Sequence, residues 1–425
     1  MTIVTPRPLW AGRVAAVLGI VLLALNLRTA VAVLSPILSF VSEDIALDSV
    51  GIGLLGMLAP LAFAASGFVA PVVARRIGLE ATTVLACVAM VLGPLVRAVA
   101  PSYWILVLGS ILAMAGMGFA NIVLPPVIKK YFPDRVAFIT GAYVTLMSLS
   151  AAIPPLVAAP LAESVGWRAT VGVWSLLAVG ALVPWIAVLV QHRGRSRQSE
   201  EGAIAAPEPA LLGRMHNSRV ARAPALAFAV TALNVYALFA WLPEIVIDTA
   251  GVTPTQAGAL VALFGIIGLP LGLVAPVLAA RVRNIGWVML VAVVVYVAGY
   301  LGLLLAPAAA PWLWVFLVGT GPLVFPLTLV LINLRSRSHE GSIALSGFVQ
   351  GIAYALGALG PLVIGLLHDV TKGWTVPLLF LLATTLLTLI SAVMLAKPRM
   401  VEDELRPGTA PRRRARRGAR VPPPR

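Results

Sequence analysis

Long apolar stretches recur along almost the whole 425-residue chain, and they constrain the fold more than any other feature. Residues 14–40 and 287–306 are typical of them. A helix rises 1.5 Å per residue, so about 20 apolar residues cross roughly 30 Å of hydrocarbon. Only 11% of the residues are charged, whereas soluble domains carry about 25%. A water-soluble fold is therefore excluded, and an all-α membrane protein is expected.

Hydropathy and helix-breaking residues together predict twelve transmembrane helices. The predicted helices cover residues 14–38, 52–74, 81–99, 103–127, 137–160, 170–190, 223–247, 257–280, 286–306, 312–334, 342–366 and 375–396. The first apolar stretch is too long for the core of a signal peptide and is interrupted by Arg28, so we interpret it as a retained helix.

The distribution of Lys and Arg predicts the orientation of the chain. With the N-terminus placed in the cytoplasm, 27 of the 31 Lys and Arg residues fall on the cytoplasmic side. Only Arg97, Arg168 and Lys372 fall outside, and Arg28 lies within the first helix. Basic loops stay in the cytoplasm, so both termini are expected there, in a bacterial cytoplasmic membrane. The same rule accounts for the net charge of +15 without nucleic acid.

Short sequence matches indicate an internal duplication. Three pairs occur at offsets between 205 and 208 residues, each at the same place in its half: Ala24-Leu-Asn26 with Ala232-Leu-Asn234, Val69-Ala-Pro-Val72 with Val274-Ala-Pro-Val277, and Gly166-Trp167 with Gly373-Trp374. Parallel repeats of a six-helix unit are typical of the major facilitator architecture, which the chain resembles.

The duplication divides the chain into four parts. Residues 1–190 and 223–396 are predicted to form two six-helix halves. Residues 191–222 are polar and rich in Arg, Ser, Glu and Pro, so they are expected to form a flexible cytoplasmic linker. Residues 397–425 are expected to be a basic, disordered tail. That tail is either merely solvated or in contact with anionic membrane lipid.

Arg28 is the strongest candidate for a functional residue, because it stands near mid-depth in the first helix. An unpaired Arg there costs roughly 2.5–3.5 kcal/mol on insertion scales. The guanidinium group could face a water-filled cavity and bind an anionic or strongly dipolar solute through two parallel hydrogen bonds. The alternative is a permanent structural pairing with backbone carbonyl groups or with Glu244, or a side chain that extends to the surface.

Other polar and aromatic residues in the predicted helices are candidates for lining a substrate cavity. Asn26 and its repeat counterpart Asn234, and Asn121 in the fourth helix, either line the cavity or tie helices together. Tyr236 and Trp241 follow Asn234 and either stack on a flat solute or pack structurally.

Glu244 follows Pro243, which loosens the last turns of a helix, and it is a candidate for proton coupling. Burial in a low dielectric favours the protonated form of a carboxyl group, as proton coupling requires. The alternative is a solvated carboxylate, because the helix is predicted to end near residue 247.

Sequence signatures of enzymes are missing. All four histidines fall in predicted loops or at helix ends, and no metalloprotease or phosphate-binding motif occurs. Cys87 is the one cysteine, so neither a disulfide nor a cysteine pair for a metal is possible. We therefore expect no enzymatic activity, no cofactor and no metal. No ATP-binding domain is present, so any uphill transport would draw on a gradient.

One pair of segments resembles a specific family. Asn26-Leu-Arg28, together with residues 121–135 (NIVLPPVIKKYFPDR), is similar to the cyanate permease and nitroimidazole transporter (CynX/NimT) family of bacterial major facilitators. Thr140-Gly-Ala-Tyr143 and Trp241-Leu-Pro243 fit the same family. The resemblance implies a small, polar, often anionic or planar solute. The family usually has Pro after Asn-Leu-Arg, so Thr29 implies a smaller kink here.

The leading hypothesis is a secondary transporter of a small polar or anionic solute that works by alternating access. A cyanate-like anion, a small carboxylate or a nitroheterocycle would fit, with a coupling proton as a further partner and a monomer as the expected state. A broad-specificity drug exporter is the first alternative, for which an apolar cavity and a structurally paired Arg28 would be expected. A membrane-embedded solute sensor is the second alternative.

Overall fold

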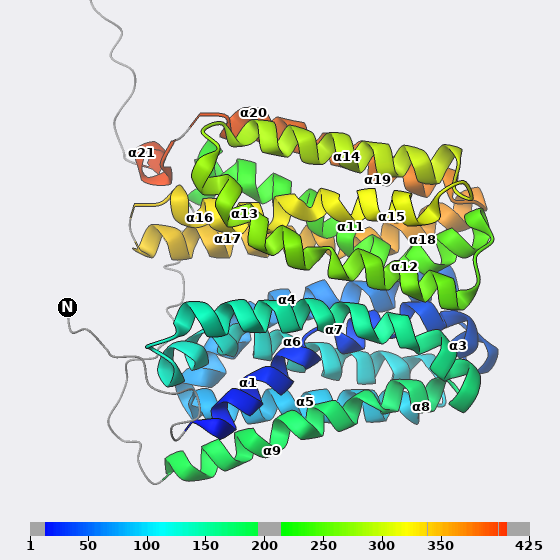
Figure 1. Cartoon of the computed structure of the whole chain (residues 1–425), viewed down its shortest axis with the longest axis horizontal. Coiled ribbons are helices and arrows are strands. Elements are labelled where there is room, and N and C mark those ends of the chain that lie inside the picture. Colours follow the sequence, from blue (N-terminus) through cyan, green and yellow to red (C-terminus); the bar gives the residue numbers. More distant parts are fainter. Residues whose placement is uncertain (1–12, 194–213, 338, 398, 406–425) are drawn as a thin grey trace, which may run out of the picture.

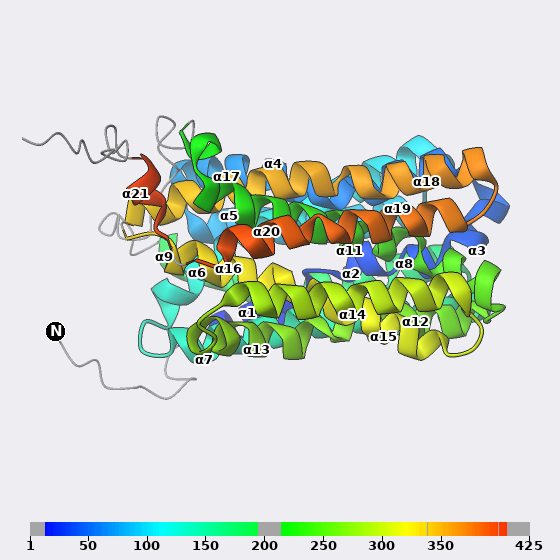
Figure 2. The ribbon, with the colours of Figure 1, turned by 90° about the horizontal axis from the view of Figure 1, so that it is seen from above.

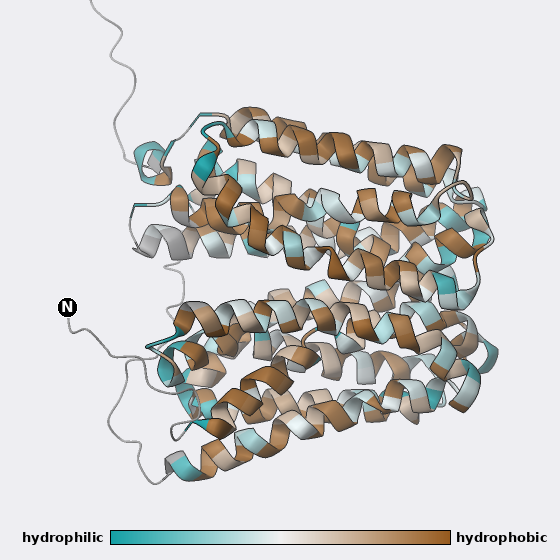
Figure 3. Cartoon of the chain, in the orientation of Figure 1, coloured by the Kyte–Doolittle hydropathy of each residue, from teal (hydrophilic) through white to brown (hydrophobic). Residues whose placement is uncertain are grey.

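The computed structural model describes residues 13–193, 214–337, 339–397 and 399–405. Within them, twelve helical stretches are long and apolar enough to cross a membrane, as predicted. No strand occurs in the same residues. Figure 3 shows hydrophobic residues along the length of the helices and hydrophilic residues gathered mainly toward their ends. The predicted all-α membrane fold is therefore confirmed.

The first half contains α1 (Val14–Asn26), α2 (Thr29–Ala32), η1 (Ser35–Ile37), α3 (Leu38–Asp44), α4 (Ser49–Ile77), α5 (Leu79–Ala98), α6 (Tyr103–Tyr131), α7 (Val136–Val165), α8 (Trp167–Gly172) and α9 (Trp174–Arg193). The second half contains η2 (Met215–Asn217), α11 (Arg219–Ala250), α12 (Pro254–Ile266), α13 (Gly268–Arg281), α14 (Ile285–Leu305), α15 (Pro311–Thr320), η3 (Gly321–Leu323), α16 (Val324–Leu334), α17 (His339–Gly357), α18 (Leu359–Thr371), α19 (Thr375–Leu386), α20 (Thr388–Leu395) and α21 (Val401–Leu405).

Several helices extend beyond their predicted ends, and α11 is the clearest example. It begins at Arg219 and ends at Ala250, although residues 223–247 were predicted. Pro224 lies in its second turn, and Pro243 lies inside it without ending it. In a membrane bundle, neighbouring helices and local adjustments satisfy the backbone groups that a proline frees. The proline positions therefore mark no helix ends here.

The chain forms two bundles that lie side by side (Figures 1 and 2). Helices α1–α9 make the lower bundle in Figure 1, and α11–α20 make the upper one. The bundles meet chiefly where α4 packs on α18 and where α7 packs on α12. Many large apolar side chains are exposed, among them Trp104, Leu176, Trp287 and Val393, as a lipid-facing surface requires.

The two halves diverge toward the end where the described chain begins and finishes. A Cβ atom on Gly258 in α12 would overlap the carbonyl oxygen of Pro155 in α7. One on Gly265 would lie 3.0 Å from the carbonyl oxygen of Ala151. At Gly272 in α13 the nearest atom is 3.9 Å away, in Val144 of the same α7. The interface between the halves is thus tight at one end of the bundle and looser at the other (Figure 1).

Two expectations need correction. Arg97 was counted with the charges on the outer side, near the end of the predicted helix 81–99, but it lies inside α5 and is 0% exposed. The tail was expected to be disordered from residue 397, but residues 401–405 form α21. There Val401 is buried and Glu404 accepts a hydrogen bond from Ser218 Oγ at 2.7 Å. Most of the predicted linker (194–213) and the rest of the tail (406–425) lie outside the described residues.

Candidate functional site

The first membrane span is broken at Arg28. Helix α1 ends at Asn26, α2 starts at Thr29, and Arg28 between them has φ −133° and ψ −5°. Side chains satisfy the carbonyl groups that the break frees, since Thr29 Oγ1 donates to Asn26 O at 3.1 Å and Arg28 Nη1 donates to Leu27 O at 2.9 Å. The first span is therefore broken without a proline, and a smaller kink than in family members that have Pro stays a prediction. These local hydrogen bonds replace the effect of a proline.

The guanidinium group of Arg28 is surrounded by aromatic residues. It lies over the ring of Phe63, 5.0 Å from the ring centroid. It is also within electrostatic range of Tyr143, Tyr236 and Tyr354. Among the described residues Arg28 forms no ion pair, with Glu244 or with any other acid. A half-buried cation with one local hydrogen bond retains N–H donors for a solute.

The three tyrosines around Arg28 come from both halves of the protein. Tyr143 lies in α7, Tyr236 in α11 and Tyr354 in α17. The rings of Tyr236 and Tyr354 are 6.5 Å apart, and those of Phe63 and Tyr354 are 6.4 Å apart, both edge to face. Within the described part of the chain, none of the three hydroxyl groups has a hydrogen-bond partner. Arg28 and the three tyrosines therefore lie in one region, to which both halves contribute.

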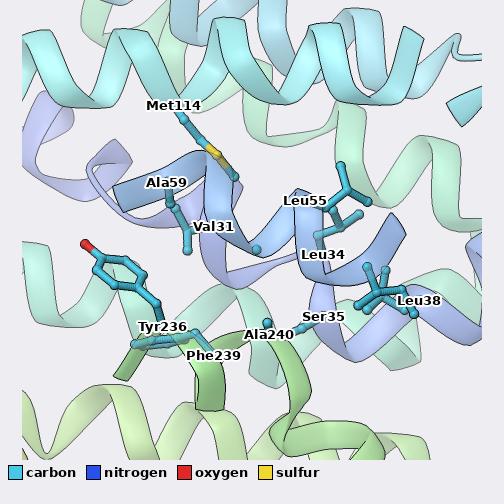
Figure 4. A pocket seen from close by; sticks show the side chains of 12 residues that line it. Val31, Leu34, Ser35, Leu38, Leu55, Ala59, Met114, Tyr236, Phe239 and Ala240 are labelled. Carbon is cyan, nitrogen blue, oxygen red and sulfur yellow. The ribbon is translucent and has the colours of Figure 1, made fainter. Parts of the chain in front are cut away.

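A small cavity lies next to the first span (Figure 4), and its first lining residue, Val31, follows Arg28 by three positions. Its volume is about 40 Å³, room for roughly two or three water molecules. Its lining comes from the first, second, fourth and seventh spans: Val31, Leu34, Ser35, Leu38, Ile52, Leu55, Gly56, Ala59, Met114, Tyr236, Phe239 and Ala240. The lining is mainly apolar, but Ser35 Oγ is buried without a hydrogen-bond partner.

Three of the predicted lining residues lie close to this region. Tyr236 lines the cavity directly. Asn121 is half-buried in α6 and donates to Met117 O at 3.0 Å. It lies seven residues after the cavity-lining Met114, hence on the same helix face. Asn26 is buried at the end of α1 and donates to Leu22 O at 2.8 Å. Roles for Asn26 and Asn121 in binding a solute remain predictions.

Asn234 and Trp241 are placed differently, because both are 0% exposed. Asn234 donates to Thr384 Oγ1 at 3.0 Å and accepts from the Tyr300 hydroxyl at 2.7 Å, so it ties three spans together. The indole of Trp241 donates to Pro361 O at 2.8 Å and joins α11 to α18. Neither lines the cavity. Both make hydrogen bonds between helices in this conformation, and a role for either in binding a solute stays a prediction.

Glu244 does not lie at the predicted end of its helix, because α11 continues to Ala250. Its side chain is half-buried, with no hydrogen bond or ion pair among the described residues, and it is within electrostatic range of Asp248 and Asp369. Eight residues separate it from Tyr236, which is about 12 Å along the helix. Glu244 is therefore separate from the cluster around Arg28 and lies toward the tightly closed end.

Phe63 and Tyr354 were missed by sequence reasoning. Neither stands next to a polar residue in its helix, and aromatic residues are common packing residues in membrane spans. Tyr143 belongs to one of the family-like segments but was given no role. Only the packing of α4, α7 and α17 around the broken first span brings these rings to Arg28.

Comparison with known proteins places the chain in a family. Residues 18–358 match the Major Facilitator Superfamily. An uncharacterized transporter, YycB, of Bacillus subtilis is 31% identical over 86% of this chain and 89% of its own length. The 2-nitroimidazole transporter of Escherichia coli is 31% identical over 90% and 94%, and the cyanate transport protein CynX of the same organism is 24% identical over 84% and 91%.

A solved structure has the same fold. A bacterial homologue of the human lysosomal transporter Spinster, in an inward-facing and occupied conformation, superposes with a TM-score of 0.69 at 14% identity, over 95% of this chain and all of that one. The relatives are transporters and not enzymes. The chain belongs to the Major Facilitator Superfamily and is a transporter of the CynX/NimT type.

Proposed function

We propose that this transporter moves a small polar or anionic solute across the bacterial cytoplasmic membrane by alternating access. The observation that supports it most is the environment of Arg28. It is a half-buried cation at a helix break, has no acidic partner among the described residues, and faces tyrosines from both halves. A guanidinium group binds carboxylate and similar planar anions through paired hydrogen bonds. Because Arg28 lies between the halves, a solute bound there can be exposed to either side of the membrane as the halves move.

The class of solute follows from charge, size and the relatives. A cavity of about 40 Å³ admits a body of only a few atoms until the halves move. Two relatives are named for 2-nitroimidazole and for cyanate, which are both small, polar and rich in π electrons. A cyanate-like anion, a small carboxylate or a nitroheterocycle therefore fits this site. Phe63 and the tyrosines offer ring faces and edges to such a solute.

The orientation follows from the positive-inside rule, which puts both termini in the cytoplasm. The halves are tight around Gly258 and looser around Gly272, toward the end where the described chain begins and finishes. In this orientation the conformation is closed to the outside and loosened toward the cytoplasm. Transport then also requires the opposite arrangement, in which α13 packs closely on α7 and the contact between α12 and α7 opens.

We propose Glu244 as a site of proton coupling. It is half-buried, lacks a cationic partner among the described residues and lies near two further carboxylates, Asp248 and Asp369. Substitution Glu244→Gln should abolish the dependence of uptake on an imposed pH gradient while exchange at equal pH continues. Glu163→Gln, at an exposed carboxylate in α7, is the matched control. Uptake by Glu244→Gln that still follows the gradient would exclude this role.

The proposed function is tested by a thermal-shift screen of purified protein with small anions and nitroheterocycles. A ligand that binds the folded state raises its stability by about 2.7 kcal/mol at one hundred times Kd. The wild-type protein should be stabilised by at least one of these solutes. Arg28→Ala should lose the shift, whereas Arg283→Ala, at an exposed arginine beyond α13, should keep it. A shift that survives in Arg28→Ala would exclude Arg28 from the site.

A broad-specificity drug exporter remains the second candidate, because the cavity lining is mainly apolar. Such a protein should bind large apolar compounds in the same screen, and their binding should not require Arg28. Resistance that persists in cells expressing Arg28→Ala would favour export over the uptake or exchange of a small anion.

A further inference from the structure

A second arginine is more deeply buried than Arg28. Arg97 in α5 is 0% exposed and makes no ion pair with an acid in the described part of the chain. Its Nε donates to Ser110 Oγ at 2.8 Å, and its Nη1 donates to Ala30 O at 2.7 Å. Nη2 is buried without a partner. An uncompensated buried cation is costly and marks a functional constraint more often than simple packing.

The surrounding helices are shaped to admit this side chain. A Cβ atom on Gly109 in α6 would lie 2.8 Å from the backbone nitrogen of Arg97 and 3.0 Å from its Cγ. The neighbouring Ser110 donates its own hydroxyl hydrogen to Leu106 O at 2.7 Å, which leaves its oxygen to accept from Arg97. The guanidinium group is therefore held in one orientation between α5 and α6, with Nη1 directed at the first span.

The acceptor on the first span lies in the short segment after the break. Ala30 belongs to α2, which spans Thr29–Ala32 and begins directly after Arg28. Its carbonyl oxygen accepts no turn or loop hydrogen bond from a backbone N–H group of the described residues, because the helix does not continue regularly beyond Ala32. Thr29 and Arg28 satisfy the freed carbonyls of Asn26 and Leu27 locally. Arg97 is the partner that reaches α2 from another span.

We propose that Arg97 is a positioning residue for transport: by holding α2 through the Ala30 carbonyl, it fixes where the guanidinium group of Arg28 points. This inference rests on the proposed role of Arg28. Arg97 itself does not touch the solute. A buried arginine with two directed donors fits this task better than an apolar residue, which would leave the Ala30 carbonyl unsatisfied in a low dielectric.

The test measures the position of Arg28 without requiring the solute. Val31 lines the cavity one turn beyond Arg28. In a Cys87→Ala background, Val31→Cys is labelled with an anionic and a cationic methanethiosulfonate reagent of similar size. A nearby positive charge favours the anionic reagent, and one charge about 8 Å away changes the ratio of the two rates on the order of fivefold in water. The ratio should fall to near the free-thiol value in Arg28→Ala.

Arg97→Met should lower the same ratio, with at most a small further change when it is combined with Arg28→Ala. A double-mutant cycle of this form separates an effect that acts through Arg28 from the loss of the Arg97 charge itself. Thr83→Val, at a buried residue of α5 whose hydroxyl donates to Leu79 O of the same helix, is the control and should retain the wild-type ratio. Thermal unfolding checks that each variant is folded. If Arg97→Met is not folded, the ratio of labelling rates is measured in Arg97→Gln instead.

Two outcomes would overturn the inference. A wild-type ratio in folded Arg97→Met would show that α2 needs no such support. If Arg97→Met lowers the ratio of labelling rates as much in the Arg28→Ala background as in the wild type, the charge of Arg97 acts directly on the reagents. Both differ from failure of the proposed function, which would appear as an unchanged ratio in Arg28→Ala alone.

Discussion

The indole nitrogen of Trp374 donates a hydrogen bond to Asp248 Oδ2 at 2.8 Å, and so joins the start of α19 to the end of α11. The first half repeats this arrangement, because Trp167 at the start of α8 donates to Asp44 Oδ2 at 2.9 Å at the end of α3. The repeated Gly-Trp pairs in the sequence thus correspond to repeated contacts. Both contacts lie at the end of the bundle where the halves are closed.

The acceptor aspartates of the two contacts differ in the number of their partners. Matched substitutions of the two tryptophans should therefore lower stability unequally. Asp44 also pairs with Arg168, whereas Asp248 has no second hydrogen-bond partner in the described residues. A hydrogen bond to a charged group contributes about 1.5 kcal/mol or more. Trp374→Phe should therefore lower the thermal unfolding temperature more than Trp167→Phe does. Equal shifts would show that Arg168 does not support Asp44.

The contact at Asp44 also predicts a dependence of stability on pH. Hydrogen bonds from Trp167 and then Arg168 hold the pKa of Asp44 below its ordinary value of 3.8. A carboxyl group with a lowered pKa in the folded state stabilises it at pH values above the ordinary pKa, and this contribution is lost as the pH falls through the folded-state pKa. The unfolding temperature should therefore fall below about pH 4, and less steeply in Asp44→Asn. An identical pH profile in Asp44→Asn would contradict this assignment.

Asn234 offers a test of structure against binding. Its hydrogen bonds to Thr384 and Tyr300 join three spans, and such bonds in membranes contribute about 0.6 kcal/mol each on average. Asn234→Leu should lower stability by about 1 kcal/mol, while the KM for transport stays near the wild-type value. Thr384→Val, which removes one partner, should have a smaller effect in the same direction. A raised KM at unchanged stability would return Asn234 to the solute pathway.

The divergence of the halves predicts a substitution that traps one conformation. A Cβ atom on Gly272 would lie in ordinary contact with Val144, 3.9 Å from its Cγ1. A small side chain therefore fits here, whereas Gly272→Trp should hold α13 and α7 apart. Binding should persist while net transport stops. The smaller Gly272→Ala, which keeps ordinary contact distances, is the control. Transport by Gly272→Trp at the wild-type rate would show that this interface does not close.

The spans could be predicted because their hydropathy and the alternation of basic loops are properties of the sequence alone. Helix ends could not, since Pro224 and Pro243 lie inside α11 without ending it. Arg97 follows an apolar run close to a loop, and its burial depends on the hydroxyl of Ser110 and the carbonyl of Ala30. The break at Arg28 has no Pro or Gly to announce it. Of the residues in the candidate site, the sequence therefore suggested Arg28 and Tyr236 but not Phe63 and Tyr354.

The most direct test of the central claim is uptake into proteoliposomes containing purified wild-type, Arg28→Lys or Arg28→Ala protein. The probes are labelled cyanate and 2-nitroimidazole at concentrations below KM. Loss of a charge-assisted hydrogen-bonded pair predicts a fall of roughly tenfold or more in the uptake rate for Arg28→Ala, with Arg28→Lys between it and the wild type. Uptake of either solute by Arg28→Ala with wild-type KM and maximal rate would contradict the account.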